Sequence, residues 1–217
     1  MTDQNLKKRS RGRPRLDASD GRDDIKRAAL AEFAKRGFKG ASVDHIAKRA
    51  KVAKRLIHYH FGSKDALWHE AVSDAYNEFQ KEILDFISER QNHQDASLLD
   101  AVSKQIVFFA ASRISLIHIS IDETRQGGER SDWLKSTYLI PFQKIMAHQI
   151  GLYLGDNAKG QAVAAHLVPA IFGAIVFPYV DADVVSEAHE RDVFSQNYQT
   201  EHIALISALI KASLHDV

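Results

Sequence analysis

The sequence predicts an all-α protein, and three observations support this fold class. Apolar residues recur at intervals of three and four along most of the chain. The strict alternation of apolar and polar residues that is typical of half-buried strands is absent from the sequence. The composition, with 45% hydrophobic residues, 26% charged residues and no cysteine, is typical of a folded soluble protein without disulfides or zinc–thiolate sites.

The N-terminal quarter predicts a basic arm followed by three helices. Residues 1–19 are polar and basic, without periodicity and without the apolar segment of a signal peptide, so we expect them to be disordered. Helices are predicted at 20–36, 42–50 and 54–61, and Gly37 marks the end of the first one.

The remainder predicts longer helices, which brings the expected total to about nine. They are expected at residues 64–89, 96–112, 114–122, 131–154, 158–178 and 196–215, with loops at 126–132 and 154–160. The chain then divides into a disordered arm (1–19), a small three-helix domain (20–66) and a larger helical domain (67–217).

One segment, residues 162–180, is apolar over 19 residues, about the length that crosses a bilayer. His166, Pro169 and Pro178 interrupt it, and acidic residues follow it at 181 and 183. A helix that is apolar all round is also typical of a helix between two layers or two subunits, so we expect an interface helix and no membrane association.

Charge is distributed unevenly between the two parts of the chain. Residues 1–64 carry 18 Lys and Arg against 7 Asp and Glu, whereas residues 65–217 carry 11 against 21. A basic front on an acidic body indicates that the front meets a polyanion, the alternative being a chance fluctuation.

The two short helices at 42–50 and 54–61 predict a helix-turn-helix motif. Apolar residues at 46, 47, 52, 57 and 61 would form its buried side. The second helix would present an outward set to a DNA major groove, namely Lys54, Arg55, His58 and Tyr59. The alternative is a pair of core helices with a solvated basic face.

The segment SVDHIAKRAKVAKRLIHYHFGSKDAL, residues 42–67, resembles the TetR-type transcriptional regulators. The preceding AALAEFAKRGFKGASV is similar to the lead-in of that family. The resemblance implies a helix-turn-helix DNA-binding domain at 20–66 and an effector-binding and dimerisation domain at 67–217. It also implies a cytoplasmic protein with no catalytic activity and no cofactor.

The resemblance also implies roles for single residues. Ser42, at a helix start, and Lys64 are expected to contact phosphates. Tyr59 and His60 are placed to touch the DNA backbone. Lys54 and Arg55 are the expected base readers, and Arg55 is the first choice because arginine can pair bidentately with guanine.

Three residues depart from the family pattern. Lys51 replaces the turn glycine, which costs about 1 kcal/mol if the left-handed conformation is kept; otherwise the turn changes shape. Ala53 replaces a serine cap and forfeits about 1 kcal/mol. His58 replaces a tyrosine and adds either a pH-sensitive contact or nothing.

The arm contains RGRP, residues 11–14, which resembles the core of an AT-hook, although Ser10 stands where the hook has proline. In such a hook Arg11 and Arg13 would enter an A·T-rich minor groove, and Gly12 would avoid its floor. The alternative is a solvated tail.

For the larger domain we expect a homodimer and a pocket. The predicted dimer contacts are Leu167, Ile171, Ile175, Ile203, Ile206 and Ile210. The predicted pocket residues are Phe108, His118, Trp133, Tyr138, Phe142, His166 and Phe172, each of which could instead be an ordinary core residue.

Enzyme motifs such as G-x-S-x-G and H-E-x-x-H are absent from the sequence. His118 with Asp122, and His58 with His60, leave a metal-responsive regulator as an alternative. The first pair lacks an evident third ligand, and the second lies in the helix expected to face DNA. We therefore expect a regulator, most simply a repressor, that binds an inverted repeat with A·T-rich flanks as a dimer and is released by an unknown small molecule. A DNA-binding protein without an effector is the other alternative.

Overall fold

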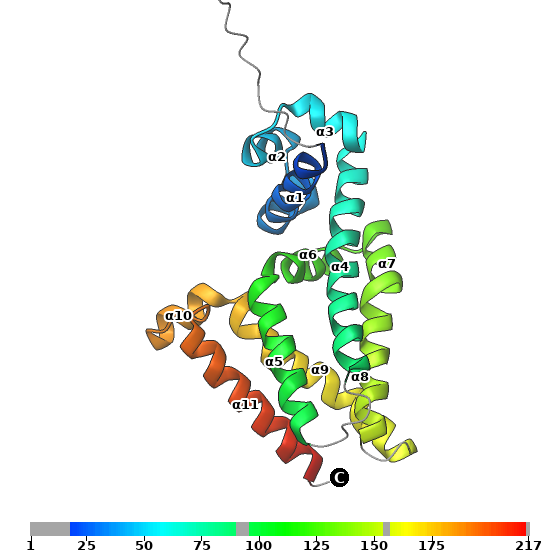
Figure 1. Ribbon diagram of the computed structural model, residues 1–217, viewed down its shortest axis with the longest axis vertical. Coiled ribbons are helices and arrows are strands. Elements are labelled where there is room, and N and C mark those ends of the chain that lie inside the picture. Colours follow the sequence, from blue (N-terminus) through cyan, green and yellow to red (C-terminus); the bar gives the residue numbers. More distant parts are fainter. Residues whose placement is uncertain (1–17, 90–95, 154–156, 216–217) are drawn as a thin grey trace, which may run out of the picture.

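A computed structural model describes residues 18–89, 96–153 and 157–215 (Figure 1). These residues form eleven α-helices and one π-helical turn, and no strand occurs among them. The all-α prediction is confirmed.

The N-terminal helices α1 (Ala18–Gly40), α2 (Val43–Ala50) and α3 (Lys54–Phe61) form a compact unit at one end of the molecule, called the head below (Figure 1). Within α1 the helical path breaks at Gly37, where φ is 64° and ψ is 171°. A residue with a side chain would be strained in that conformation, which explains the glycine.

The long helix α4 (Lys64–Ser88) runs from the head along the rest of the molecule (Figure 1). Ion pairs fasten α1 to it, with 2.6 Å between Arg22 Nη2 and Glu70 Oε1 and 2.5 Å between Lys26 Nζ and Asp74 Oδ2. The domain boundary expected near residue 66 lies inside this continuous helix, so α4 belongs to both parts.

The remaining helices, called the body below, follow in chain order. They are α5 (Ala96–Ser112), α6 (Ile114–Gln126), α7 (Glu129–Leu134), η1 (Lys135–Leu139), α8 (Ile140–Tyr153), α9 (Ala158–Val180), α10 (Ala182–His189) and α11 (Gln196–His215). Helix α6 crosses beneath α1, and α5, α9 and α11 pack together at the far end (Figure 1).

Two elements of the body differ from the sequence prediction. The single helix expected at 131–154 contains a π-helical turn directly before Pro141. In a regular helix the proline ring would clash with the carbonyl of residue 137, and a wider turn relieves this contact. The short helix α10 was not predicted from the sequence.

Helix α9 is the one described helix that is long and apolar enough to cross a membrane by itself, although only 28% of its most apolar window is buried. It packs on α5, α8 and α11 within the same chain. It therefore acts as a core helix that leaves an apolar side uncovered.

Candidate DNA-binding site and internal cavity

The turn between α2 and α3 keeps the left-handed conformation in spite of its lysine. Lys51 has φ 57° and ψ 36°, and its N–H donates to the carbonyls of Ala47 and Lys48. Ala53, which precedes α3, provides no side-chain cap. Both departures from the family pattern therefore cost stability without changing the turn.

The buried sides of α2 and α3 hold the motif together. Ile46, Ala47, Ile57 and Phe61 are buried, and Ala47 is small enough for the two helices to cross closely. Polar contacts add to this at α1, where the buried carboxylate of Glu32 lies 3.1 Å from both Arg36 Nε and His45 Nδ1. Apolar packing thus sets the orientation of α3, and the contacts of Glu32 join α1 to α2.

The opposite side of α3 is exposed and basic. Tyr59 is 82% exposed, and Arg55, which is also exposed, makes no ion pair with another described residue. Lys54 forms a 2.9 Å ion pair with Asp44 of α2, and His58 Nδ1 lies 3.3 Å from the carbonyl oxygen of Gly62. Arg55 and Tyr59 are therefore the groups on this face that are free to meet a ligand.

The two expected phosphate contacts lie beside the motif in different states. Ser42 Oγ accepts a 3.2 Å hydrogen bond from the N–H of Asp44 and so caps α2, while its own proton stays available. Lys64 Nζ donates to the carbonyls of Phe38 and Ala41, at 2.8 and 3.0 Å. Lys64 thus fastens the end of α1 to α4, which leaves one of its three protons for a phosphate.

His60 is half-buried, with its ring edge-on to Tyr59 and Phe61. The other expected contacts, Arg11, Gly12 and Arg13, lie outside the described residues.

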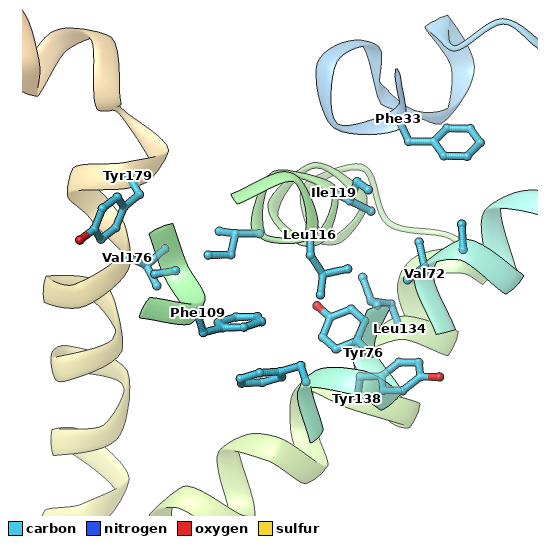
Figure 2. Packing of buried hydrophobic residues seen from close by; sticks show 14 of the residues in the cluster. Phe33, Val72, Tyr76, Phe109, Leu116, Ile119, Leu134, Tyr138, Val176 and Tyr179 are labelled. Carbon is cyan, nitrogen blue, oxygen red and sulfur yellow. The ribbon is translucent and has the colours of Figure 1, made fainter. Parts of the chain in front are cut away.

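A cavity of about 230 Å³ lies in the body, between α4, α5, α6, α8 and α9. Its lining consists of Tyr76, Phe79, Gln80, Phe109, Leu116, Ile117, Ser120, Ile121, Thr124, Leu139, Phe142, Gln143, Phe172 and Val176. Figure 2 shows Phe109 of α5 and Tyr76 of α4 pointing toward each other beneath Leu116 of α6. The cavity therefore touches the long helix that enters the head and the helix that packs under α1.

The structure brings only part of the predicted pocket set to this cavity. Phe142 and Phe172 line it, and Tyr138 stacks on Tyr76 from behind at 4.6 Å between ring centroids. Phe108 and His166 are exposed instead.

The two other members of the predicted pocket set also lie elsewhere. His118 Nε2 is 3.4 Å from the carbonyl oxygen of Val180, and Trp133 packs against Trp68 and His69.

The residues that α4 and α6 contribute to the cavity were not predicted from the sequence. Tyr76 and Phe79 continue the apolar stripe of α4 and look like ordinary core residues. The available signal was a pair of hydroxyls, Ser120 and Thr124, four residues apart on a largely apolar helix.

A junction between head and body centres on Arg130 of α7. Its guanidinium lies 3.6 Å from the ring centroid of Phe38, and its Nε lies 3.2 Å from the buried carboxylate of Glu123. A weaker contact of 3.6 Å reaches Asp65 at the start of α4. One side chain thus contacts α1, α4 and α6 together.

Three of the six predicted dimer contacts are buried inside the chain. Ile175, Ile206 and Ile210 are buried within the protomer, and the other three are half-buried. The exposed apolar faces lie on the opposite sides of the same helices. On α9 this face consists of Ala162, Pro169, Ala170, Gly173 and Phe177, and on α11 of Ala204, Leu205, Ala208 and Leu209.

Among the residues that the structure describes, no group of three or more His, Asp or Glu side chains is placed to hold a metal ion.

Comparison with known proteins identifies the head. Residues 25–71 match the family model of the bacterial regulatory proteins of the tetR family. Over 60 residues the chain is 38% identical to the HTH-type transcriptional repressor NicS of Pseudomonas putida, and this alignment covers 28% of each chain. Over 81 residues it is 27% identical to the HTH-type negative transcriptional regulator IcaR of the biofilm operon icaADBC in Staphylococcus epidermidis. That second alignment covers 37% of this chain and 40% of IcaR.

The alignments therefore span less than half the length of these two relatives, whereas a structural likeness covers nearly the whole chain. A TetR-like transcriptional regulator from Rhodococcus sp. RHA1 superposes with a TM-score of 0.62 over 94% of this chain and 99% of its own, at 16% identity. That likeness shows the fold. Residues 25–71 thus match the tetR family of bacterial regulatory proteins, and the chain as a whole has the fold of a TetR-like regulator.

Proposed function

We propose that this protein is a cytoplasmic, ligand-released transcriptional repressor that binds an inverted-repeat operator as a homodimer through α3. The observation that carries the proposal is the exposed Arg55 and Tyr59 face of α3, held by a buried apolar side on a helix-turn-helix scaffold. The named relatives support the direction of control, since NicS is a repressor and IcaR a negative regulator.

Dimerisation is supported by the exposed apolar faces of α9 and α11. Phe177 is 61% exposed, Leu205 56% and Leu209 47%, on neighbouring helices. The small residues Ala162, Ala170 and Gly173 on this face allow the backbone of a second copy to approach α9 closely. Two copies joined along these faces bury apolar surface that one chain leaves in water.

Release by a ligand is supported by the position of the cavity. Tyr76 of α4 and Thr124 of α6 line it, and both helices pack against the head. A ligand that prefers one arrangement of α4 and α6 by a few kcal/mol would shift dimers away from the separation that two half-sites require, about 34–36 Å.

The decisive experiment is selection of bound sequences from randomised duplex DNA at physiological salt with the full chain. We expect an enriched inverted repeat with A·T-rich flanks. If DNA is retained without an enriched motif and is released as the salt concentration rises, the head binds phosphates without sequence specificity.

Arg55→Ala should then weaken binding to the selected operator by about tenfold to a hundredfold and relax the base preference at one position of each half-site. Lys144→Ala, which removes an exposed charge from α8, is the matched control and should leave binding unchanged. Equal binding by the wild type and Arg55→Ala would exclude α3 as the reading helix in the orientation proposed here.

A further inference from the structure

The cavity between α4 and α9 has a lining without charge. Among its described lining residues there is no Asp, Glu, Lys, Arg or His. The cavity meets solvent at Ile121 and Thr124, which are exposed. A charged group that lies deeper, among the phenylalanine rings, would lose its hydration without gaining an ion-pair partner, which is strongly unfavourable in an apolar space.

Aromatic rings make up much of the wall. Phe79 stacks on Phe109 with 3.6 Å between ring centroids and lies 5.2 Å from Phe142, which in turn lies 6.3 Å from Phe172. Such walls favour a ring that packs flat or edge-on against them. The volume of about 230 Å³ exceeds the roughly 150 Å³ cavity that accepts benzene, so a single substituted ring fits.

The hydroxyl protons on one side of the cavity are already engaged in hydrogen bonds within the protein. Ser120 Oγ donates to the carbonyl of Leu116 at 2.6 Å, and therefore the Tyr76 hydroxyl donates to Ser120 Oγ. Thr124 Oγ1 donates to the carbonyl of Ser120 at 2.7 Å. What remains open on Tyr76 and Thr124 is acceptor capacity.

Burial raises the pKa of Tyr76 to about 12, so its hydroxyl stays neutral near pH 7. The hydroxyl therefore stays protonated and donates its hydrogen bond to Ser120. It can accept a hydrogen bond from a ligand, but it carries no negative charge.

We propose that the cavity takes a small, neutral, single-ring compound that carries a hydrogen-bond donor, such as a phenol or an aromatic alcohol. The ring would pack among Phe79, Phe109 and Phe142, and the donor would bond to the open lone pairs of Tyr76 or Thr124. This inference rests on the proposed function only for its regulatory meaning, because binding itself requires no DNA.

The test uses five probes that share a methyl-substituted ring: 4-methylphenol, p-xylene, 4-methylanisole, 4-methylbenzoate and 4-methylbenzylamine. Binding to the full chain at pH 7 is measured by isothermal titration calorimetry. We expect 4-methylphenol to bind about fivefold more tightly than p-xylene or 4-methylanisole. The benzoate and the protonated benzylamine should bind at least about a hundredfold more weakly than the phenol.

Thr124→Val and Tyr76→Phe assign the site, because each removes an acceptor and keeps the shape of the side chain. The variant that removes the acceptor used by the phenol should reduce binding of 4-methylphenol by about fivefold, and neither variant should change binding of p-xylene. Thr137→Val on η1 is the matched control, since that exposed threonine does not line the cavity. Thermal unfolding of each variant confirms that it is folded.

Three results would overturn the proposal: binding of a charged probe as tight as that of the phenol, failure of all five probes to bind, or a phenol preference that survives in both acceptor variants. Selective phenol binding without any operator in the DNA selection would leave the ligand class standing and remove the regulatory function. Selection of an operator, together with failure of all five probes to bind, would leave the regulatory function standing and remove the proposed ligand class.

Discussion

The head and the body differ in how their helices divide between core and solvent. In the head, Ile46 and Ile57 are 0% and 1% exposed while Tyr59 on the opposite side is 82% exposed. In the body, α9 is apolar on both sides, so that Ile175 is 1% and Phe177 61% exposed. In the head, the apolar sides of the helices are buried and the polar sides face solvent. The body leaves apolar surface exposed.

The largest expected effect is a loss of dimerisation after changes in the exposed apolar surface of the body. Replacing both Leu205 and Leu209 by glutamate would place four carboxylates in the apolar interface of a dimer and should weaken dimerisation by at least about a hundredfold. Light scattering coupled to size-exclusion chromatography should then show a monomer. Val184→Glu, at an exposed apolar position on α10, should leave the dimer intact. A dimeric double variant would place the interface elsewhere.

The second prediction concerns the junction where head and body meet. Arg130→Met leaves the carboxylate of Glu123, which is 3% exposed, without its 3.2 Å partner. The free energy of unfolding should fall by about 2–3 kcal/mol in urea titrations, because a buried charge loses its compensation.

Adding Glu123→Gln to Arg130→Met should recover part of that loss, since the unpaired charge is then removed. Arg125→Met, which removes an exposed ion pair on α6, is the control and should cost less than about 0.5 kcal/mol. A loss no larger than in this control would show that Glu123 is compensated by other groups.

The third prediction tests the head at its strained turn. Lys51→Gly should stabilise the chain by about 1 kcal/mol, because glycine adopts the left-handed conformation at φ 57° without the clash of a β-carbon. Lys48→Gly in the interior of α2 should instead destabilise it by about 1 kcal/mol. The midpoints of urea unfolding measure both, and a Lys51→Gly variant that is no more stable than the wild type would show that the lysine makes a compensating contact.

The smallest expected effect is a pH dependence in the body. Burial lowers the pKa of His202 from 6.5; its ring lies between Tyr179 and Tyr198, and its Nε2–H donates to the carbonyl of Ile175 at 3.4 Å. The unfolded chain takes up a proton near pH 6.5 that the folded chain takes up only at lower pH. Stability from this group is therefore present above pH 6.5 and is lost as the pH falls below it.

His202→Phe should flatten the fall in stability between pH 6.5 and 5, as measured by urea unfolding at several pH values. His148→Phe replaces an exposed histidine on α8 and should leave the slope as it is. Parallel slopes for the wild type and His202→Phe would assign the acid sensitivity to other groups.

The helices of the head were predicted from the sequence more accurately than the contacts made by single residues such as Lys64. The bounds of α2 and α3 follow from short amphipathic stretches between breaks, and their buried sides were predicted from spacing alone. Lys64 shows the limit of such inference. Its place in the family pattern suggested a phosphate contact, which stays a prediction, but did not indicate its hydrogen bonds to the carbonyls of Phe38 and Ala41, which lie 26 and 23 residues earlier.

In the body the sequence predicted helices but not their orientation. Three of the six residues in the predicted dimer set, Ile175, Ile206 and Ile210, are buried inside one chain. The sequence of a helix that is apolar on every side does not indicate which side faces inward. For α9, packing against α5, α8 and α11 determines that side.

By itself, then, the sequence determined an all-α chain with a basic helix-turn-helix at its front, because charge and helical periodicity are local properties. The tertiary structure alone decided where the cavity lies and which faces of α9 and α11 stay uncovered. Both depend on contacts between segments far apart in the chain, such as Tyr76 with Ser120 and Phe142 with Phe172. Such contacts form only when the helices pack, and packing selects one side of each helix from several that are equally apolar.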